Sequence, residues 1–299
     1  YNEENEQNFL FQSDYIRPLG EEGKFETGVR ITNRRIENVY SVEVRGPDED
    51  WNIVDSLAND FIYLETIYAG YLMYGNKIGK FSYQGGLRAE YSDIGTELVE
   101  TQQVNNRDYI NLFPSVHLSY EISQKKSVQL TYSRRLSRPH FRSLLPFSNF
   151  SDNRNFRRGN PDLDPEYTDS YEAGYLMFGE MGSLLSSVYY RHRTGAIERV
   201  SFADDRGITT SMPVNLGVED AYGLELNVSF TPAEWMNING DFNFYRSVIV
   251  GEYAGQNLNA DTYTWSSRLT AKTTIWDKLN IQFSGRYRAP RITPQGRRK

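Results

Sequence analysis

Leu279-Asn-Ile-Gln-Phe-Ser-Gly-Arg-Tyr-Arg288 alternates between apolar and polar residues along its whole length. Residues 222–230 and 110–120 show the same alternation. Because successive side chains of a strand point to opposite faces, each segment is expected to have one apolar and one wet face. The pattern recurs along the chain and predicts about twelve strands, with an ambiguous phase only around residues 62–74.

The connections between these segments are alternately short and long. The short connections lie near residues 19–24, 75–80, 123–126, 180–182, 231–234 and 277–278. The long connections lie at 46–59, 93–108, 139–166, 203–207 and 250–260. Short turns at one rim and long loops at the other rim are typical of outer-membrane barrels. We therefore predict an all-β, antiparallel transmembrane β-barrel. The arms of the hairpin over residues 184–230, each about 20 residues long, should project beyond the lipid.

Composition excludes several classes of protein. No apolar run reaches the roughly 20 residues of a membrane-spanning helix, and the mean hydropathy of the 299 residues is -0.63. The chain has no cysteine, which excludes disulfides and thiolate metal sites. A net charge of -6 argues against nucleic acid as a partner. His117, His140 and His192 form no metal-binding pair, and no catalytic motif is present, so we expect no metal, no cofactor and no enzyme activity.

The direction of the strands gives an expectation about the whole barrel. If short turns are periplasmic, the first strand runs inward and the last strand runs outward. Bacterial barrels have an even number of strands and begin and end on the periplasmic side. We therefore interpret residues 1–299 as a partial barrel domain that lacks an odd number of strands at each end. The parent barrel would have about fourteen strands or more.

Four motifs in the central part of the chain resemble a known family. They are Tyr132-Ser-Arg-Arg-Leu-Ser-Arg-Pro139, Leu145-Pro-Phe147, Gly159-Asn-Pro-Asp-Leu-Asp-Pro-Glu166 and Tyr171-Glu-Ala-Gly-Tyr175. In this order they resemble the barrel portion of TonB-dependent receptors from Bacteroidota, in the outer membrane protein β-barrel family. The resemblance covers most of the chain from about residue 61 onward.

The resemblance carries further implications about the parent protein. It implies a barrel of about 22 strands, filled by an N-terminal plug that is absent from this chain. The chain would be the barrel wall of a receptor that imports a glycan, a peptide or a metal chelate across the outer membrane of a Gram-negative bacterium. Implied partners are outer-membrane lipid and lipopolysaccharide, the TonB complex through the missing plug, and a surface lipoprotein. The alternatives are a passive outer-membrane porin and a secreted soluble β-rich binding module or adhesin.

The segment from Gly159 to Glu166 is also interpretable from its residue types. Gly159 tolerates a positive φ, and Asn160 is held extended by Pro161. Pro165 fixes the approach to the strand that follows. With Leu163 between these prolines, we expect a rigid re-entry from a long loop into a strand, and we favour this structural role over direct ligand contact.

Arginines concentrate around the same loop. The candidate ligand-binding residues are Arg135, Arg138, Arg142, Arg154, Arg157 and Arg158. Because arginine binds carboxylates and phosphates through two parallel hydrogen bonds, they could form a cationic outer vestibule for an anionic or glycan ligand. The alternative, which we favour, is contact with lipopolysaccharide phosphates or pairing with carboxylates of the plug and neighbouring strands.

Overall fold

The computed structural model of the chain describes residues 1–46, 50–54, 58–146, 154–276 and 278–298. In this part of the chain the regular structure is β-strand apart from one short helix, α1 (Phe141–Leu144). The strands are β1 (Asn2–Leu19), β2 (Gly23–Tyr40), β3 (Glu43–Arg45), β4 (Trp51–Ile53), β5 (Asn59–Ile78), β6 (Phe81–Leu98), β7 (Gln103–Ser123), β8 (Lys126–Ser137), β9 (Asn155–Arg157), β10 (Glu166–Gly179), β11 (Gly182–Thr194), β12 (Ile197–Ala203), β13 (Thr209–Asn215), β14 (Gly217–Ala233), β15 (Met236–Tyr253), β16 (Gln256–Asn257), β17 (Ala260–Ile275), β18 (Leu279–Arg288), β19 (Arg291–Thr293) and β20 (Gly296–Arg298).

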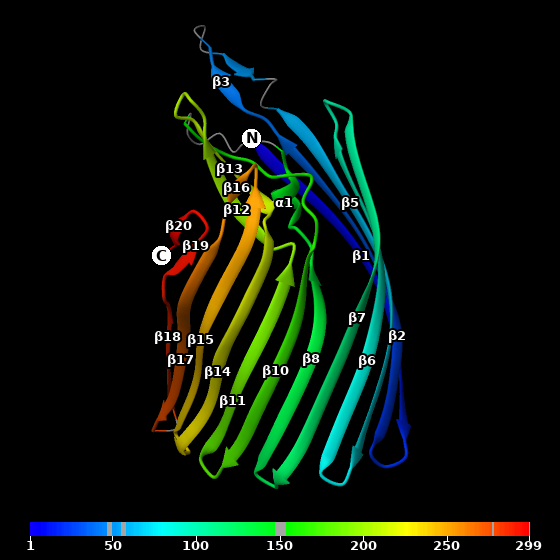
Figure 1. Ribbon diagram of the computed structural model, residues 1–299, viewed down its shortest axis with the longest axis vertical. Helices are drawn as coiled ribbons and strands as arrows, with labels where there is room; N and C mark the ends of the chain where they lie inside the picture. Colours follow the sequence, from blue (N-terminus) through cyan, green and yellow to red (C-terminus); the bar gives the residue numbers. More distant parts are fainter. Residues whose placement is uncertain (47–49, 55–57, 147–153, 277, 299) are drawn as a thin grey trace.

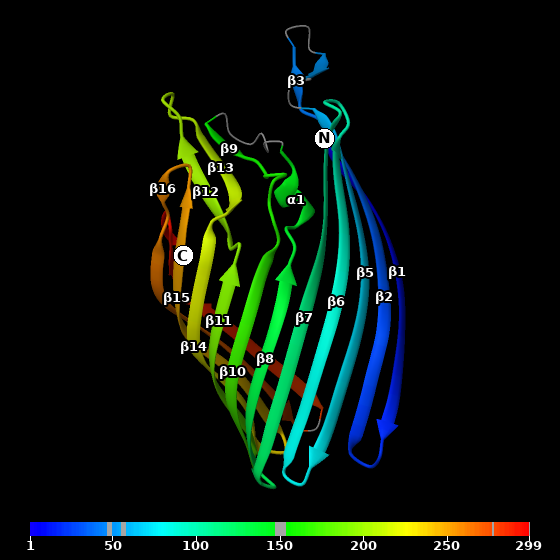
Figure 2. The ribbon, with the colours of Figure 1, turned by 45° about the vertical axis from the view of Figure 1, so that its right-hand side comes forward.

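Twelve long strands form one antiparallel sheet and confirm the predicted fold class. Their order is β1-β2-β5-β6-β7-β8-β10-β11-β14-β15-β17-β18, with β16 added beside β15. The sheet curls into an open trough (Figures 1 and 2). Among the described residues, its edge strands β1 and β18 pair only with β2 and β17. A curled, open, antiparallel sheet is the geometry of part of a barrel wall.

The strand register keeps the two phases of the alternation on separate faces. Leu226 of β14 lies opposite Phe242 of β15, whereas Asn227 lies opposite Asp241. The helix α1 identifies the inner face, because it lies within the trough (Figure 2) and packs against Tyr63 of β5. Followed from strand to strand, the register puts Asn227 on the same face as Tyr63. The polar phase therefore faces inward and the apolar phase faces outward.

The predicted gathering of the short connections at one end of the sheet is confirmed, although not every connection predicted to be long is a loop. The short turns at residues 20–22, 79–80, 124–125, 180–181 and 234–235 gather at the lower end of Figure 1. The elaborated connections lie at the opposite end, where β3 and β4 form a hairpin that begins at Glu43 and ends at Ile53. The sheet thus has short turns at one rim and longer, partly structured connections at the other rim.

Two of the predicted long loops are wrong. Residues 93–108 continue β6 and β7 as paired strands, and only residues 99–102 form the turn. Residues 250–260 likewise continue β15 and add β16. At the outer end of β6 the apolar residues Ile94 and Leu98 pack on the inner face, and Asp93 lies opposite Asp108 on the outward face. The alternation that predicts a lipid-facing strand is therefore lost there.

The predicted long arms over residues 184–230 are not continuous strands. β11 ends at Thr194, and the chain resumes as β12 after Gly195, whose φ of +67° is the left-handed conformation that glycine accepts. β12 and β13 then form a separate three-stranded sheet, in which β9 runs parallel to β13. The projecting part is therefore its own small sheet at the elaborated end (Figure 1).

Two buried apolar clusters lie near the elaborated end. The first joins the inner faces of β2, β5 and β6 to α1 and Leu163 through Ile36, Phe61, Tyr63, Leu98, Phe141 and Leu144. The second joins β12 and β13 to β15 and β17 through Val200, Val214, Leu216, Ile249, Leu258 and Ala260. The first explains the ambiguous phase of residues 62–74, because the outer part of β5 packs apolar residues on its inner face as well as its outward face.

Candidate functional site

The motif from Gly159 to Glu166 lies where the loop after β8 returns to the sheet. The Gly159 N–H donates to the Leu145 carbonyl at 2.6 Å, and the Asn160 N–H donates to the Ser143 carbonyl at 2.7 Å. A Cβ on Gly159 would lie 2.5 Å from both carbonyl oxygens. Gly159 is not among the glycines with positive φ, so that expectation is wrong. Close backbone approach is what requires glycine here.

The middle of the motif is fixed by buried and polar contacts. Leu163 is 3% exposed in the cluster beneath α1. Arg107 of β7 donates to the Leu163 carbonyl at 2.7 Å and to the Asp164 carboxylate at 2.9 Å. Asn215 holds the main chain of Asp164 by accepting from its N–H at 2.8 Å and donating to its carbonyl at 2.9 Å.

Glu166 connects the motif to the neighbouring strands. Its carboxylate is nearly buried, accepts from the Ile197 N–H at 2.6 Å and pairs with Arg193 at 3.1 Å. The loop, the main sheet and the outer small sheet therefore meet at this carboxylate. This geometry is compatible with a rigid joint, and the structural role of the motif stays a prediction.

The same loop bridges a gap between β7 and β8, where the two strands stop pairing. These strands pair from Ser115 opposite Ser133 downward, whereas the outer half of β7 pairs only with β6. Pro114 stands at the point of separation, and proline cannot donate to a ladder. Above it, contacts between Arg107 and the main chain at Leu163 bridge the gap.

The candidate arginines do not form one vestibule. Arg138 points to the inner face, where it donates to Glu90 at 2.8 Å and to Ser92 at 2.7 Å and lies 3.6 Å from Glu65. Arg142 pairs with Glu4 at 2.8 Å. Arg135 is exposed on β8 opposite Thr168. Arg138 and Arg142 are therefore engaged by carboxylates of the strands β1, β5 and β6.

The remaining candidates belong to the outer small sheet. The carbonyl of Arg154 accepts from the Thr209 N–H at 2.8 Å, and the N–H of Arg158 donates to Ser211 at 3.1 Å. Both side chains are exposed, as is that of Arg157 at the end of β9. Burial, and then the charge of Arg157, lower the pKa of Arg199 on β12. These arginines thus lie on β9 and its flanks, apart from Arg138 and Arg142.

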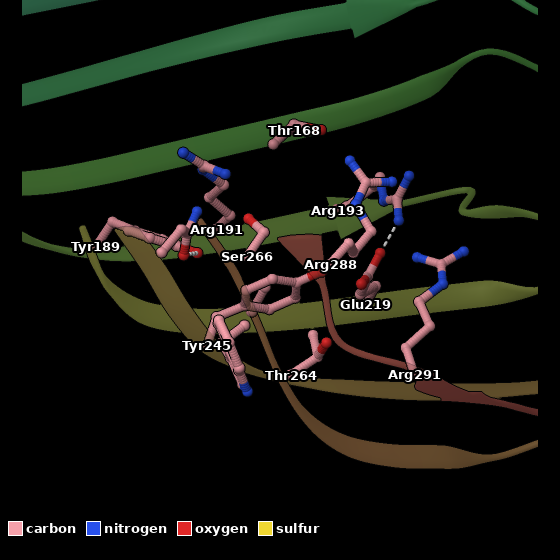
Figure 3. A pocket seen from close by; sticks show the side chains of 13 residues that line it. Thr168, Tyr189, Arg191, Arg193, Glu219, Tyr245, Thr264, Ser266, Arg288 and Arg291 are labelled. Atoms are coloured by element: carbon pink, nitrogen blue, oxygen red, sulfur yellow. Dashed lines mark hydrogen bonds and ion pairs between the residues drawn. The ribbon is translucent and has the colours of Figure 1, made fainter. Parts of the chain in front are cut away.

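A different set of arginines surrounds an inward-facing cavity of about 420 Å³. Its charged lining residues are Arg191 and Arg193 of β11, Glu219 of β14, Arg288 of β18 and Arg291 of β19. In Figure 3, Arg193, Arg288 and Arg291 gather at one end, and Arg191 lies beside Tyr189 at the other. We call this cavity the arginine pocket.

The contacts within the arginine pocket differ from one arginine to the next. Arg193 is paired with both Glu219 and Glu166. Arg291 is 3.8 Å from Glu198. The Arg191 guanidinium lies 4.1 Å from the centre of the Tyr189 ring, a cation–π contact. Against the four lining arginines stand Glu219 in the lining and Glu166 and Glu198 next to it, so the pocket keeps an excess of positive charge.

Sequence reasoning missed the arginine pocket because its residues are far apart in the chain. The alternation already puts Glu219, Arg191 and Arg288 on the polar phase of their strands. Their proximity depends on register, which places Arg193 opposite Glu219 and Ser266 opposite Arg288. The sequence shows which charged residues belong to the polar phase. It does not show the strand register that brings them together.

A family model described as the outer membrane protein beta-barrel family matches residues 1–299. The chain belongs to this family. Membership places it in the outer membrane and is not compatible with the secreted soluble alternative. The family match does not specify a bacterial lineage, so the assignment to Bacteroidota stays a prediction. Among curated protein sequences, none matches this chain.

Solved structures share the fold of this family member at low sequence identity. The copper transporter OprC is 12% identical with a TM-score of 0.65, over 91% of this chain and 44% of that one. The ferric yersiniabactin uptake receptor FyuA from Yersinia pestis is 13% identical with a TM-score of 0.66, over 99% and 45%. The siderophore receptor PiuA from Acinetobacter baumannii is 12% identical with a TM-score of 0.68, over 97% and 47%. The chain therefore spans less than half the length of these proteins.

Within the described residues, no three His, Asp or Glu side chains are grouped so that they could hold a metal ion. The same part of the chain contains no helix of the length and apolarity needed to cross a membrane. His192 contacts Asp220 at 2.8 Å on the outward face, and His140 caps α1.

Proposed function

We propose that this chain forms part of the wall of an outer-membrane receptor that imports a nutrient. The observation that carries the proposal is the division of the sheet into an apolar outward face and a polar inner face that holds the arginine pocket. A wall of this kind separates lipid from a wet, ligand-accessible lumen. The shared fold with OprC, FyuA and PiuA, named as a transporter and as receptors, supports uptake.

Energised uptake extends the proposal beyond the wall. The resemblance of the central motifs implies a plug and a TonB complex that act on the lumen of the parent barrel. A glycan, a peptide or a metal chelate would then be the cargo, and the chain itself would carry no enzyme activity. The names of these structural neighbours, none of which is that of an enzyme, are in keeping with this function.

The test compares the parent bacterium with an in-frame deletion of the gene. Growth is measured on panels of peptides, glycans and iron chelates as sole nutrient sources. We expect the deletion to lose growth on one class, and re-expression of the full-length gene to restore it. Equal growth of both strains on every source, when the protein is produced, would contradict the proposal.

A passive porin is separated from a receptor by the energy requirement. Uptake of the identified nutrient is measured with and without a protonophore. A receptor driven from the inner membrane loses uptake when the proton gradient collapses, whereas a porin continues to equilibrate its solute. Swelling of liposomes that contain the purified full-length protein, in arabinose, would also indicate an open pore.

A further inference from the structure

We propose that the arginine pocket is a binding subsite for a carboxylate or phosphate group of the transported molecule. The role of that molecule as cargo rests on the proposed uptake function, whereas anion binding itself does not. The pocket lies on the inner face between β11, β14, β15, β17 and β18, so a molecule in the lumen would meet it.

The arginine pocket holds positive charge that no carboxylate compensates. Arg193 is already neutralised by Glu166 and Glu219. In the part of the chain that the structure describes, neither Arg191 nor Arg288 has a carboxylate within ion-pair distance. The one lining carboxylate, Glu219, pairs with Arg193, so the guanidinium groups of Arg191 and Arg288 can each hold an incoming oxyanion through two parallel hydrogen bonds.

Part of the pocket is preorganised. The Arg191 guanidinium is held over the ring of Tyr189, whose side chain is only 6% exposed. The Tyr189 hydroxyl donates to Asn243 Oδ1 at 2.9 Å, which fixes the Asn243 amide. Among the described residues, Asn243 Nδ2 has no partner and can donate to a ligand. Fixed donors lose less conformational entropy on binding than mobile ones.

The pocket has the size and the chemistry of a small-molecule site. A volume of about 420 Å³ falls within the range of about 300–1,000 Å³ that is typical of small-molecule pockets. Thr264 and Ser266 of β17 add hydroxyl groups to the lining, and Tyr245 adds a phenol. This mixture of guanidinium, amide and hydroxyl donors recognises oxygen-rich anions and offers little to a purely apolar ligand.

The experiment measures citrate and inorganic phosphate binding to the purified full-length protein in detergent by calorimetry at low salt. Arg191→Gln combined with Arg288→Gln removes the two unpaired cations. We expect citrate to bind the unmodified protein, triethyl citrate not to bind, and the double variant to bind citrate about tenfold more weakly or worse. The matched control is Arg268→Gln with Arg286→Gln, a cross-strand pair on the same face outside the pocket. The control should retain citrate affinity within about twofold.

Three results would overturn the proposal. The first is an unmodified protein that binds neither citrate nor phosphate. The second is an equal loss of affinity in the pocket variant and the control. The third is a lower Tm of the pocket variant without added anion, combined with no effect of citrate on the unmodified protein. That result would assign the arginines to a carboxylate of the protein itself. Loss of uptake is measured separately in cells, so either proposal can fail while the other stands.

Discussion

At the scale of single residues, Gly159 shows how a motif is fixed by backbone contact. Alanine at this position would place a Cβ 2.5 Å from the carbonyl oxygens of Ser143 and Leu145, and both belong to the main chain. We predict that Gly159→Ala lowers the free energy of unfolding by about 1–3 kcal/mol. The measurement is urea unfolding of the full-length protein in detergent. Gly85→Ala is the control, because nothing lies within 4 Å of a Cβ there. Equal stability of both variants would show that the approach is not tight.

Arg138 is a second residue with a clear energetic role. It is about one-fifth exposed and is surrounded by Glu65, Glu90 and Ser92. Arg138→Gln leaves the largely buried Glu65 without its ion-pair partner, whereas Glu90 keeps Arg88 at 2.6 Å, and we predict a loss of about 3 kcal/mol. Arg142→Gln breaks the more exposed pair with Glu4 and should cost less than about 1 kcal/mol. Comparable losses in the two variants, measured by the same unfolding assay, would contradict this difference in burial.

At the scale of elements, β14 tests which face meets lipid. Leu226 is on the outward phase and Asn227, the next residue, is on the inner phase. We predict that Leu226→Arg destabilises the folded barrel by about 2–4 kcal/mol in lipid, because an arginine there would face hydrocarbon. Asn227→Arg should change stability by less than about 1 kcal/mol, since it would face the wet lumen. The reverse order in a folding titration into liposomes would mean that the faces are exchanged.

The elements also show what the sequence alone can predict. β14 and β18 were predictable because lipid on one side and water on the other force strict alternation. The outer part of β6 was not predictable as a strand of the wall, since it turns the apolar Ile94 and Leu98 to the inner face and the polar Asp93 to the outward face. β5 was ambiguous because Phe61 and Tyr63 pack under α1 on the face that is otherwise polar.

The candidate site was less predictable than the fold, for a related reason. Arginines that are close in sequence, such as Arg138 and Arg157, are separated by the path of the loop. The arginine pocket is instead assembled from strands whose register depends on turn geometry at the short rim. The alternation indicated which side chains face inward, and only the fold could show where positive charge accumulates on that face.

At the scale of the whole molecule, the edges of the sheet determine what the chain can do alone. Strands β1 and β18 each have one unpaired side among the described residues. Unpaired backbone groups are costly in an apolar medium, so we predict that residues 1–299 refolded alone in detergent give no heat-resistant monomer. The measurement is gel mobility with and without boiling, with the full-length protein as the positive control. A heat-modifiable monomer of the isolated chain would show that these edges can close.

The most direct test of the account is the accessibility of successive positions along one strand in a membrane. The chain has no cysteine, so single cysteines at positions 224–229 of the full-length protein can carry spin labels without background. In liposomes, we predict that labels at Leu224, Leu226 and Val228 collide with lipid-soluble oxygen. Labels at Glu225, Asn227 and Ser229 should collide with a water-soluble nickel chelate, which gives a period of two residues. Accessibility to the same reagent at all six positions, or the opposite phase, would contradict the assignment of a lipid face and a lumen face.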